Sequence, residues 1–359
     1  MNLRLVVLSL GLSFSSLAAQ EEPATLEARV ERIFQQLAKG DAPGAVVLVG
    51  RGKEIVLQRA FGLADLERDV PLSTASVFDI GSTSKQFTAA SVLMLEQDGK
   101  LSLADPLKKH VPELPACFDP VTLRHLMLHT SGIPDYIGLM AEAGADLEDR
   151  TKADEAVAAL VKVTALEFAT GTKWAYSNSN YFLLSEVVER VAKQPLADFA
   201  HERIFEPLGM ARTHIHADCT QIVPNRALSY SKGPRGGWVW NFSNWEQTGD
   251  GAVFTTVGDL FLWARNFTDG KVGGERLLAA MREPGKLDDG TAIEYGAGLM
   301  FAERGGRRFV VHGGAWAGYR AELLRVPAAD LVVVCLCNRD DVNPGEFARL
   351  VARAATATR

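Results

Sequence analysis

The sequence predicts an α+β fold in which an antiparallel sheet flanked by helices is built from both ends of the chain, around an inserted all-helical domain. Strand-like segments near the N-terminus are followed by a long stretch of helical segments and loops. The C-terminal part returns to short apolar segments separated by Gly, Pro and Asp turns, a spacing typical of antiparallel strands. Strands at both ends with helices between them favour one sheet interrupted by an insertion.

The composition is that of an ordinary globular protein, with 359 residues, of which 47% are hydrophobic and 23% are charged. This length allows one large or two medium-sized domains and a sizeable core. Acidic and basic residues are mixed along the chain, which has a net charge of -6. No basic stripe points to a nucleic-acid partner, so we expect none.

Residues 1–18 are predicted to be a secretory signal peptide. Arg4 precedes an apolar stretch from Leu5 to about Phe14, and the small residues that end at Ala18 fit a signal-peptidase site. A short membrane anchor is the alternative. We therefore expect a secreted protein, in the periplasm of a bacterium. No membrane span is expected after signal removal, because no apolar run reaches the roughly 18 residues that a spanning helix needs.

The N-terminal part of the mature chain predicts a helix, two strands and a second helix in that order. Apolar residues at helical spacing indicate a helix over residues 26–37. The segment 44–62, "GAVVLVGRGKEIVLQRAFG", is typical of two strands around a Gly-containing turn. The second helix is predicted to start near Ser82 and to end at Gly99, a favourable C-terminal residue.

Residues 19–359 are predicted to form one domain, with its sheet part at about 25–98 and 252–359 and its helical part at about 99–251. Pro344 is predicted to open the final helix. The four predicted C-terminal strands are "IEYGAGLMF" (293–301), "RRFVVHGG" (307–314), "YRAELLRVP" (319–327) and "DLVVVCLCN" (330–338).

The four cysteines are too few for a disulfide scaffold. Cys335 and Cys337 alternate on a predicted strand, so they share a face, are poorly placed to bridge each other and are expected to be core thiols. Whether Cys117 and Cys219 pair is left open.

Ser82 and Lys85 lie three residues apart at the start of the second predicted helix, where the helix dipole disfavours a cation. The backbone N–H of a serine at a helix N-terminus is unpaired and can stabilise a developing negative charge. A lysine three residues later shares its helix face. Desolvation lowers the pKa of such a lysine and lets it accept the serine proton. A nucleophile and its base are therefore one interpretation; a helix cap beside a solvated lysine is the other.

Five segments, taken together, carry a family resemblance. They occur in the order "SVFDIGSTSKQFTAA", "TLRHLMLHTSGIPDY", "KWAYSNSNYFLLSEVVE", "IFEPLGM" and "HGGAWAGYRAELLRVP". Over about residues 25 to 340 the chain resembles the serine β-lactamase and penicillin-binding protein superfamily, in particular its class C β-lactamase-like branch with esterase and D-peptidase relatives. The resemblance implies a β-lactamase/transpeptidase-like fold.

The resemblance also implies roles for individual residues. Ser82 matches the acylated nucleophile and Lys85 its base, while "YSN" places Tyr176 as a proton shuttle and Asn178 as a ligand of the substrate amide and of Lys85. A tyrosine with a pKa near 10 needs a nearby cation for that role, which Lys85 would provide. The third motif, "HGG", contributes His312 and Gly314, and it is followed by Ala315. The N–H groups of Ser82 and Ala315 are expected to form the oxyanion hole.

One departure from the family pattern bears on the substrate. His312 stands where the family has a lysine that attracts the carboxylate of β-lactams and D-Ala-D-Ala peptides. A histidine is mostly neutral near pH 7 unless its pKa is raised, so anion capture is expected to be weaker. This shifts the prediction toward esterase or other amidase chemistry. Arg320 is a candidate replacement for the missing anion site.

The predicted function is that of a secreted serine hydrolase that forms an acyl-enzyme on Ser82 and cleaves a short acyl ester, a D-amino-acid peptide or a β-lactam. Two alternatives remain: a true class C-like β-lactamase, and a penicillin-interacting peptidoglycan sensor with negligible turnover. The expected partner is a small-molecule or peptidoglycan-derived substrate. No cofactor is expected, and no metal, although His125 and His129 are four residues apart. Asp135 and Tyr136 are candidates for the edge of the cleft, and the oligomeric state is open.

Overall fold

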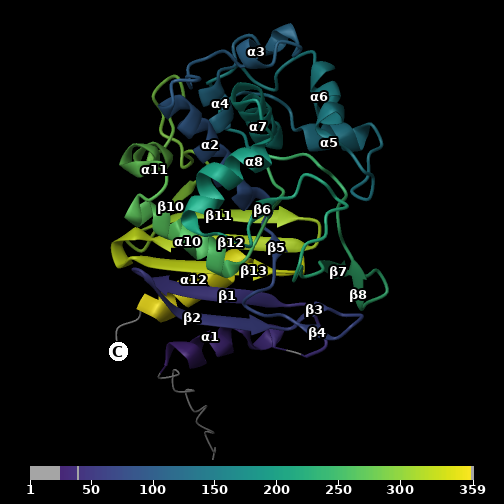
Figure 1. Ribbon diagram of the computed structural model, residues 1–359, viewed down its shortest axis with the longest axis vertical. Coiled ribbons are helices and arrows are strands. Elements are labelled where there is room, and N and C mark those ends of the chain that lie inside the picture. Colours follow the sequence, from purple (N-terminus) through teal and green to yellow (C-terminus); the bar gives the residue numbers. More distant parts are fainter. Residues whose placement is uncertain (1–24, 39, 357–359) are drawn as a thin grey trace, which may run out of the picture.

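A six-stranded antiparallel sheet, built from both ends of the chain, forms the centre of the protein (Figure 1). The computed structural model describes residues 25–38 and 40–356, so the predicted signal peptide lies outside the described residues. Pairing of β1 with β13 joins the N-terminal strands to the C-terminal ones. In sheet order the strands are β10 (Met300–Arg304), β11 (Arg307–Trp316), β12 (Tyr319–Val326), β13 (Leu331–Cys337), β1 (Ala45–Arg51) and β2 (Glu54–Phe61).

The central strands are apolar on both faces because helices cover both sides of the sheet. Val47 on β1 pairs with Cys335 on β13, and both face a core formed with α1 (Leu26–Phe34) and α12 (Pro344–Thr356). Their neighbours Val46 and Leu336 face the opposite core, which includes α2 (Lys85–Gln97) and α10 (Val257–Asp269). Cys335 and Cys337 are buried free thiols, as expected from their alternation.

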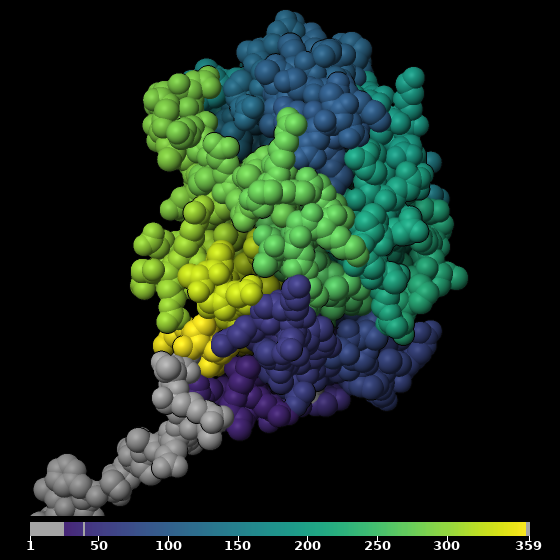
Figure 2. Space-filling view, turned by 60° about the vertical axis from the view of Figure 1, so that its left-hand side comes forward, coloured from purple at the N-terminus to yellow at the C-terminus, as the bar shows by residue number. Residues whose placement is uncertain are grey.

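The regular structure of the inserted segment, about residues 99–251, consists mainly of helices joined by long loops. It holds α3 (Leu107–His110), α4 (Leu123–Met127), α5 (Tyr136–Glu142), α6 (Ala153–Val161), α7 (Asn178–Ala192), α8 (Leu196–Ala200) and α9 (Glu206–Leu208). Most of these helices lie above the β11 side of the sheet in Figure 1. In Figure 2 the purple and yellow ends of the described chain lie together at the bottom, away from the blue middle of the chain at the top.

The prediction that this insertion is all-helical was wrong in detail. The insertion also contains the short strands β6 (His214–Ile215), β7 (Tyr230–Lys232) and β8 (Trp238–Trp240). β6 joins β5 (Phe78–Asp79) and β9 (Val253–Thr255) in a small sheet, while β7 pairs with β8. These strands have only two or three residues each, too few to leave a clear alternating pattern in the sequence. The remaining short elements are β3 (Leu63–Asp65), β4 (Val70–Pro71) and α11 (Gly274–Arg282).

Two predicted boundaries also differ from the structure. The helix predicted from Ser82 opens with a 3-10 turn, Gly81–Ser84, before α2 begins at Lys85. The strand predicted over 293–301 is formed only from Met300 onward. The residues before it form a loop in which Gly298 lies against α2, since a Cβ there would come within 2.7 Å of the Cα of Gln86.

No helix among the described residues is long and apolar enough to cross a membrane. Cys117 and Cys219 are free in the structure. The Cys117 thiol donates to the carbonyl of Val163, and the backbone N–H of Cys219 donates to Glu246.

Replacing Phe34 by alanine is expected to lower the free energy of unfolding by roughly 3–5 kcal/mol, because a buried aromatic residue is lost from a core that cannot collapse fully. The Phe34 ring packs between Phe61, at 5.0 Å, and Phe347, at 4.8 Å, and so ties α1 and α12 to β2. Urea unfolding measures the change. Leu350→Ala, at a half-exposed position of α12, is the control and should cost less than about 1 kcal/mol. Similar losses in the free energy of unfolding for the two variants would contradict the role of Phe34 as a core residue that ties α1 and α12 to β2.

Candidate active site

Ser82 and Lys85 meet at the start of α2, as the sequence predicted. Lys85 Nζ lies 3.0 Å from Ser82 Oγ. Lys85 is fully buried, although lysine is rarely found inside proteins without partners. Its ammonium head has two further acceptors, Asn178 Oδ1 at 2.8 Å and the backbone oxygen of Asp250 at 2.6 Å. These three oxygens explain why the lysine is held inside rather than extended into solvent.

Asn178, the first residue of α7, is held in place by Asp135. The carboxylate of Asp135 accepts from the Asn178 side-chain amide at 2.9 Å and from its backbone N–H at 2.8 Å. Because the amide nitrogen points to Asp135, the amide oxygen is turned toward Lys85. Asp135 also caps α5 by accepting from the N–H of Ile137. Its place is therefore behind the site, where it orients Asn178.

Tyr176 lies over the lysine and is partly exposed. Lys85 Nζ is 4.9 Å from the centre of the Tyr176 ring. The tyrosine ring also stacks on His129, with ring centres 4.3 Å apart. His129 Nδ1 accepts from the backbone N–H of Ser177, so this histidine supports the loop that carries Tyr176. Burial, followed by the charge of Lys85, holds the pKa of His129 well below its usual value.

His312 lies on β11 with its ring buried beneath the site. Burial, followed by the charge of Lys85, lowers the pKa of His312 to about 4, so the ring is neutral near pH 7. Its Nε2 is 3.3 Å from the hydroxyl of Tyr295, and its Nδ1 is 2.7 Å from the carbonyl oxygen of Gly313. A buried neutral ring with both nitrogens engaged provides no positive charge for a substrate anion.

Two glycines let the turn of Ser82 lie directly against β11. Gly81 has φ +46°, and a Cβ there would come within 2.7 Å of the nitrogen of Ala315. A Cβ on Gly314 would lie 1.8 Å from the carbonyl oxygen of Ile80. Any larger side chain at either position would push the turn away from the strand. The two segments that carry the predicted oxyanion donors, Ser82 and Ala315, are therefore in close contact.

Two cavities flank Ser82. The Tyr176 cavity is shallow and includes Tyr176, His312 and Glu322. The Asp250 cavity lies on the side of Asn178 and is lined by residues of β5, β9, the inserted part and the β11–β12 hairpin, among them Asp79, Tyr136, Arg226, Trp245, Gln247, Asp250, Phe254, Trp316 and Tyr319. Both cavities include Ser82 and Ala315, so a carbonyl group beside these two residues would have space on either side.

The structure brings together seven of the eight predicted site residues: Ser82, Lys85, Tyr176, Asn178, His312, Gly314 and Ala315. Arg320 is the exception. Its guanidinium donates to the carbonyls of Ala317 and Tyr319 within its own hairpin, at 2.9 and 2.6 Å, and it lines neither cavity. Arg320 is therefore not placed to replace the missing anion site, since its Nη1 is bound to its own hairpin and the residue lines neither cavity.

Sequence analysis missed three charged residues of the site, Asp79, Arg226 and Asp250. Asp79 lies within the first quoted segment but was given no role there, and no motif marked Arg226 or Asp250, because only the folded chain brings these three residues together. Asp250 had one usable signal: it lies between two glycines, an unusual place for a buried acid. Burial raises the pKa of Asp250 to about 6, although the charge of Lys85 acts against this rise.

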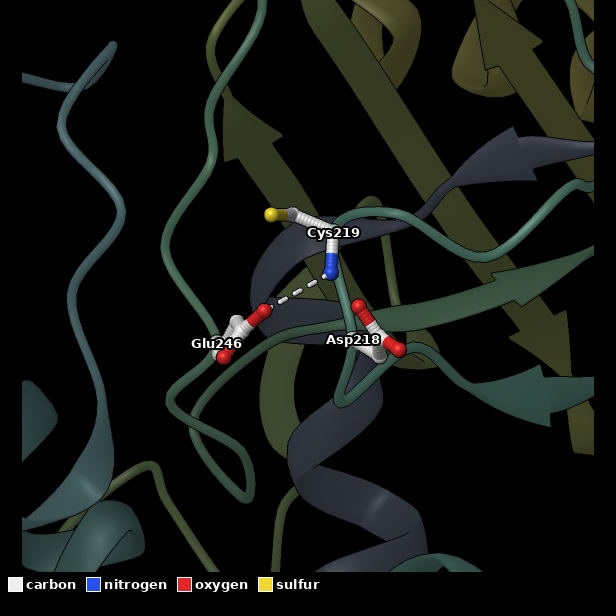
Figure 3. Close-up of side chains that lie close together, drawn as sticks. All are labelled: Asp218, Cys219 and Glu246. Carbon is white, nitrogen blue, oxygen red and sulfur yellow. Dashed lines mark hydrogen bonds between the residues drawn. The ribbon is translucent and has the colours of Figure 1, made fainter.

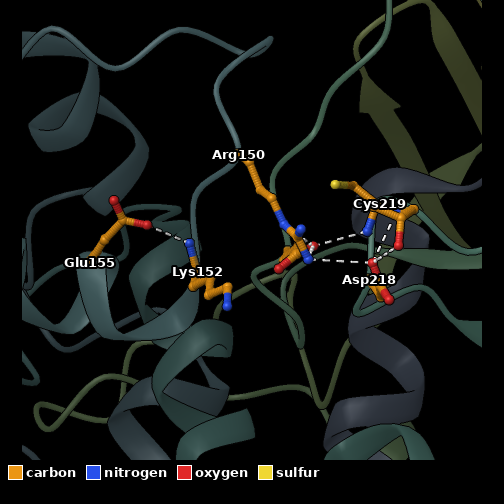
Figure 4. A network of polar contacts seen from close by, with 7 residues as sticks. Arg150, Lys152, Glu155, Asp218 and Cys219 are labelled. Carbon is orange, nitrogen blue, oxygen red and sulfur yellow. Dashed lines mark hydrogen bonds and ion pairs between the residues drawn. The ribbon is translucent and has the colours of Figure 1, made fainter.

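A cluster of ion pairs includes Glu246, the neighbour in sequence of two residues that line the Asp250 cavity, Trp245 and Gln247. Asp218, Cys219 and Glu246 offer potential ligand atoms that all lie within 4.8 Å of one another, as Figure 3 shows. Arg150 already occupies the carboxylates, at 2.8 Å from Glu246 and 3.5 Å from Asp218 (Figure 4). Burial would raise the pKa of Glu246, but the N–H of Cys219 and the guanidinium of Arg150 lower it overall. We interpret the cluster as a structural ion-pair network that holds the loop beside Trp245 in place.

With the geometry established, comparisons with known proteins identify the family. The "Beta-lactamase" family model matches residues 30–358. The chain therefore belongs to the beta-lactamase family of serine hydrolases, which confirms the family and the α+β fold predicted from the sequence.

Two curated relatives illustrate the range of the family. The chain is 27% identical to penicillin-binding protein 4* of Bacillus subtilis (strain 168) over 347 residues, which is 91% of this chain and 74% of that protein. It is 28% identical to a D-aminopeptidase of Gluconobacter oxydans (strain 621H) over 332 residues, 92% of this chain and 62% of that protein. The chain thus spans less than two thirds of the D-aminopeptidase.

A solved structure supports the fold. The octameric penicillin-binding protein homologue from Pyrococcus abyssi superposes with a TM-score of 0.80 at 24% identity, covering 92% of this chain and 76% of that one.

Gly314→Ala is expected to reduce kcat/KM by at least about 100-fold, because the new methyl group would meet the carbonyl of Ile80 and separate β11 from the turn of Ser82. Gly313→Ala is the matched control on the same strand. Its methyl group would meet only the flexible carboxylate of Glu322, at 2.9 Å, so its loss should stay within about tenfold. Steady-state kinetics on an activated ester compares the two variants. Equal losses of kcat/KM would mean that any substitution on this part of β11 impairs activity, and that the contact of Gly314 with the turn of Ser82 has no particular importance.

Proposed function

We propose that the protein is a serine hydrolase that forms an acyl-enzyme on Ser82 and cleaves amides or esters whose leaving group carries no carboxylate. The single observation that carries this proposal is the contact of Lys85 Nζ with Ser82 Oγ at 3.0 Å inside a buried pocket. A serine that is hydrogen-bonded to a positioned base is the arrangement that nucleophilic catalysis requires.

The proposed reaction has two halves. Ser82 Oγ attacks the substrate carbonyl and its proton passes to Lys85, while the N–H groups of Ser82 and Ala315 receive the oxyanion. The leaving group then takes a proton through Tyr176 as its bond to carbon breaks. In the second half, water attacks the acyl carbonyl and gives its proton to the same groups. They return a proton to Ser82 Oγ as the bond between this oxygen and the acyl carbon breaks and the acid is released.

The geometry around His312 supports the restriction on the leaving group. Tyr176 lies in the shallow cavity, so a leaving group that it protonates would occupy that cavity. No lysine or arginine is among the described residues that line it. Glu322 lines it as a buried acid instead, and burial raises the pKa of Glu322 to about 7. A carboxylate on the leaving group would therefore find no partner there.

The two relatives named above support an amide substrate, since one is a D-aminopeptidase and the other a penicillin-binding protein. A useful β-lactamase activity and a sensor that stays acylated remain the competing functions. Secretion into the periplasm is a further part of the proposal, and it rests on the sequence of residues 1–18 alone.

Ser82→Ala should lower kcat/KM on p-nitrophenyl butyrate by roughly 1,000-fold or more, because the nucleophile is removed. Ser91→Ala is the matched control: it removes a hydroxyl from the same helix that donates only to the carbonyl of Phe87. This control should retain nearly full activity. Full activity of the Ser82 variant would overturn the proposal.

Parallel kinetics on nitrocefin distinguish the competing functions. Because no cation lines the leaving-group cavity among the described residues, kcat/KM on the ester should exceed that on nitrocefin at least about tenfold. Faster nitrocefin hydrolysis would identify a β-lactamase and refute the argument from His312. A stable adduct with turnover of neither compound would identify the sensor.

A further inference from the structure

The Asp250 cavity is lined by charged side chains, and some of them have oppositely charged partners in the protein while others do not. Asp79, Arg226 and Asp250 line it, and Lys85 reaches the backbone oxygen of Asp250 from beside it. A buried charge is costly unless another charge or hydrogen bonds compensate it. The partners of each group therefore indicate what kind of ligand the cavity would accept.

The negative charge of Asp79 and the positive charge of Arg226 largely compensate each other. Burial raises the pKa of Asp79 to about 6, against the hydrogen bond from the Gly81 N–H and the positive charge of Arg226. Arg226 is also held by protein groups: its Nε donates to the Tyr319 hydroxyl at 3.3 Å, and its guanidinium carbon lies 4.9 Å from the centre of the Phe254 ring. This pair leaves little net charge for a ligand to satisfy.

Asp250 is different, because its carboxylate is held only by hydrogen bonds among the described residues: the hydroxyl of Tyr136 donates to it at 3.2 Å, and so does its own backbone N–H. Within residues 25–38 and 40–356 no lysine or arginine forms an ion pair with it. Lys85 approaches only the backbone oxygen of this residue, and in the proposed reaction Lys85 must be neutral when it accepts the serine proton. At that stage the Asp250 carboxylate has no positive counterpart.

Aromatic rings complete the surroundings of this carboxylate. Trp245 and Trp316 line the same cavity with ring centres 5.7 Å apart, and Tyr136 faces Trp245 at 6.4 Å. Aromatic faces attract cations, most strongly where water is excluded. A buried carboxylate beside aromatic rings is a combination that favours an ammonium group over an anion.

We propose that Asp250 is a specificity-determining residue that binds an ammonium group on the acyl portion of the substrate. This inference rests on the proposed function, because the leaving group is assigned to the Tyr176 cavity and the acyl portion therefore to the Asp250 cavity. The ammonium has two possible sources with the same chemistry, the α-amino group of an aminoacyl substrate and the end of a lysine-like side chain.

Isosteric substrate pairs test the inference. D-alanine p-nitroanilide is compared with isobutyric p-nitroanilide, and Nα-acetyl-D-lysine p-nitroanilide is compared with its 2-aminoheptanoic acid analogue; in both pairs a methyl group replaces the ammonium. In one of the two pairs, we expect the ammonium substrate to have at least about tenfold higher kcat/KM than its uncharged partner. The pair that shows this preference tells whether the cavity binds an α-amino group or a side-chain ammonium. No preference in either pair, or a preference for glutaric mono-p-nitroanilide, whose acyl portion carries a carboxylate, would overturn the inference.

Asp250→Asn should reduce the preferred pair's ratio at least about tenfold, because the amide keeps the size of the side chain and loses its charge. Asp154→Asn makes the same chemical change on the exposed part of α6 and should leave the ratio unchanged. A ratio that survives in the Asp250 variant would assign the preference to another group.

The wild-type protein provides a test that needs no variant. The groups facing Asp250 are Lys85 from α2, Asp135 and Tyr136 from α5, and Asp79 from β5. A carboxyl with a raised pKa is ionised above that pKa, so the ammonium preference should be large at pH 7 and fall as the pH drops through about 6. The substrate ammonium stays protonated over this range. A ratio that does not change with pH would contradict the inference.

Failure of the inference and failure of the proposed function give different results. If Ser82→Ala abolishes turnover of isobutyric p-nitroanilide and no ammonium preference exists, only the role of Asp250 is wrong. If turnover of that neutral substrate does not depend on Ser82, the proposed function itself is wrong.

Discussion

The site depends on one buried group, the side-chain nitrogen of Lys85, and on the three oxygens around it. Ser82, Asn178 and the backbone of Asp250 come from the start of α2, the start of α7 and the loop before β9. A lysine is stable in such a place only where its donors are satisfied, so its burial requires all three segments to meet there. The position of the reactive serine, the orientation of the Asn178 amide and the location of the Asp250 carboxylate all follow from this contact.

The sheet provides the second fixed element, the strand β11 beside Ser82. Because the N-terminal β1 pairs with the C-terminal β13, the two ends of the chain support one continuous sheet. Gly81 and Gly314 then bring the turn and the strand together more closely than side chains would allow. The neutral ring of His312 lies beneath this contact, so the strand contributes backbone donors but no charge. The two cavities consequently differ in their electrostatics: one is lined by acids and an arginine, the other by a single buried acid and no cation among the described residues.

Features encoded locally were predictable from the sequence, while those made by distant loops were not. The continuous apolar runs of β1 and β13 and the three-residue spacing of Ser82 and Lys85 identified the sheet and the centre of the site. The strand predicted over 293–301 forms only from Met300 onward, because Gly298 lets the preceding residues pack as a loop against α2. The prediction for Arg320 failed because its Nη1 hydrogen-bonds within its own hairpin and the residue lines neither cavity, which spacing in the sequence cannot reveal. Asp250 was missed because burial and its neighbours, rather than any motif, give it a role.

The most direct test of the central claim is to trap the intermediate. The protein is mixed with p-nitrophenyl butyrate, quenched in acid within the first turnovers, digested and analysed by mass spectrometry. The account predicts a butyryl group on the peptide that contains Ser82 and its loss as the substrate is consumed. A butyryl group on another residue, or turnover with no acylated peptide at any time, would contradict an acyl-enzyme formed at the serine beside Lys85.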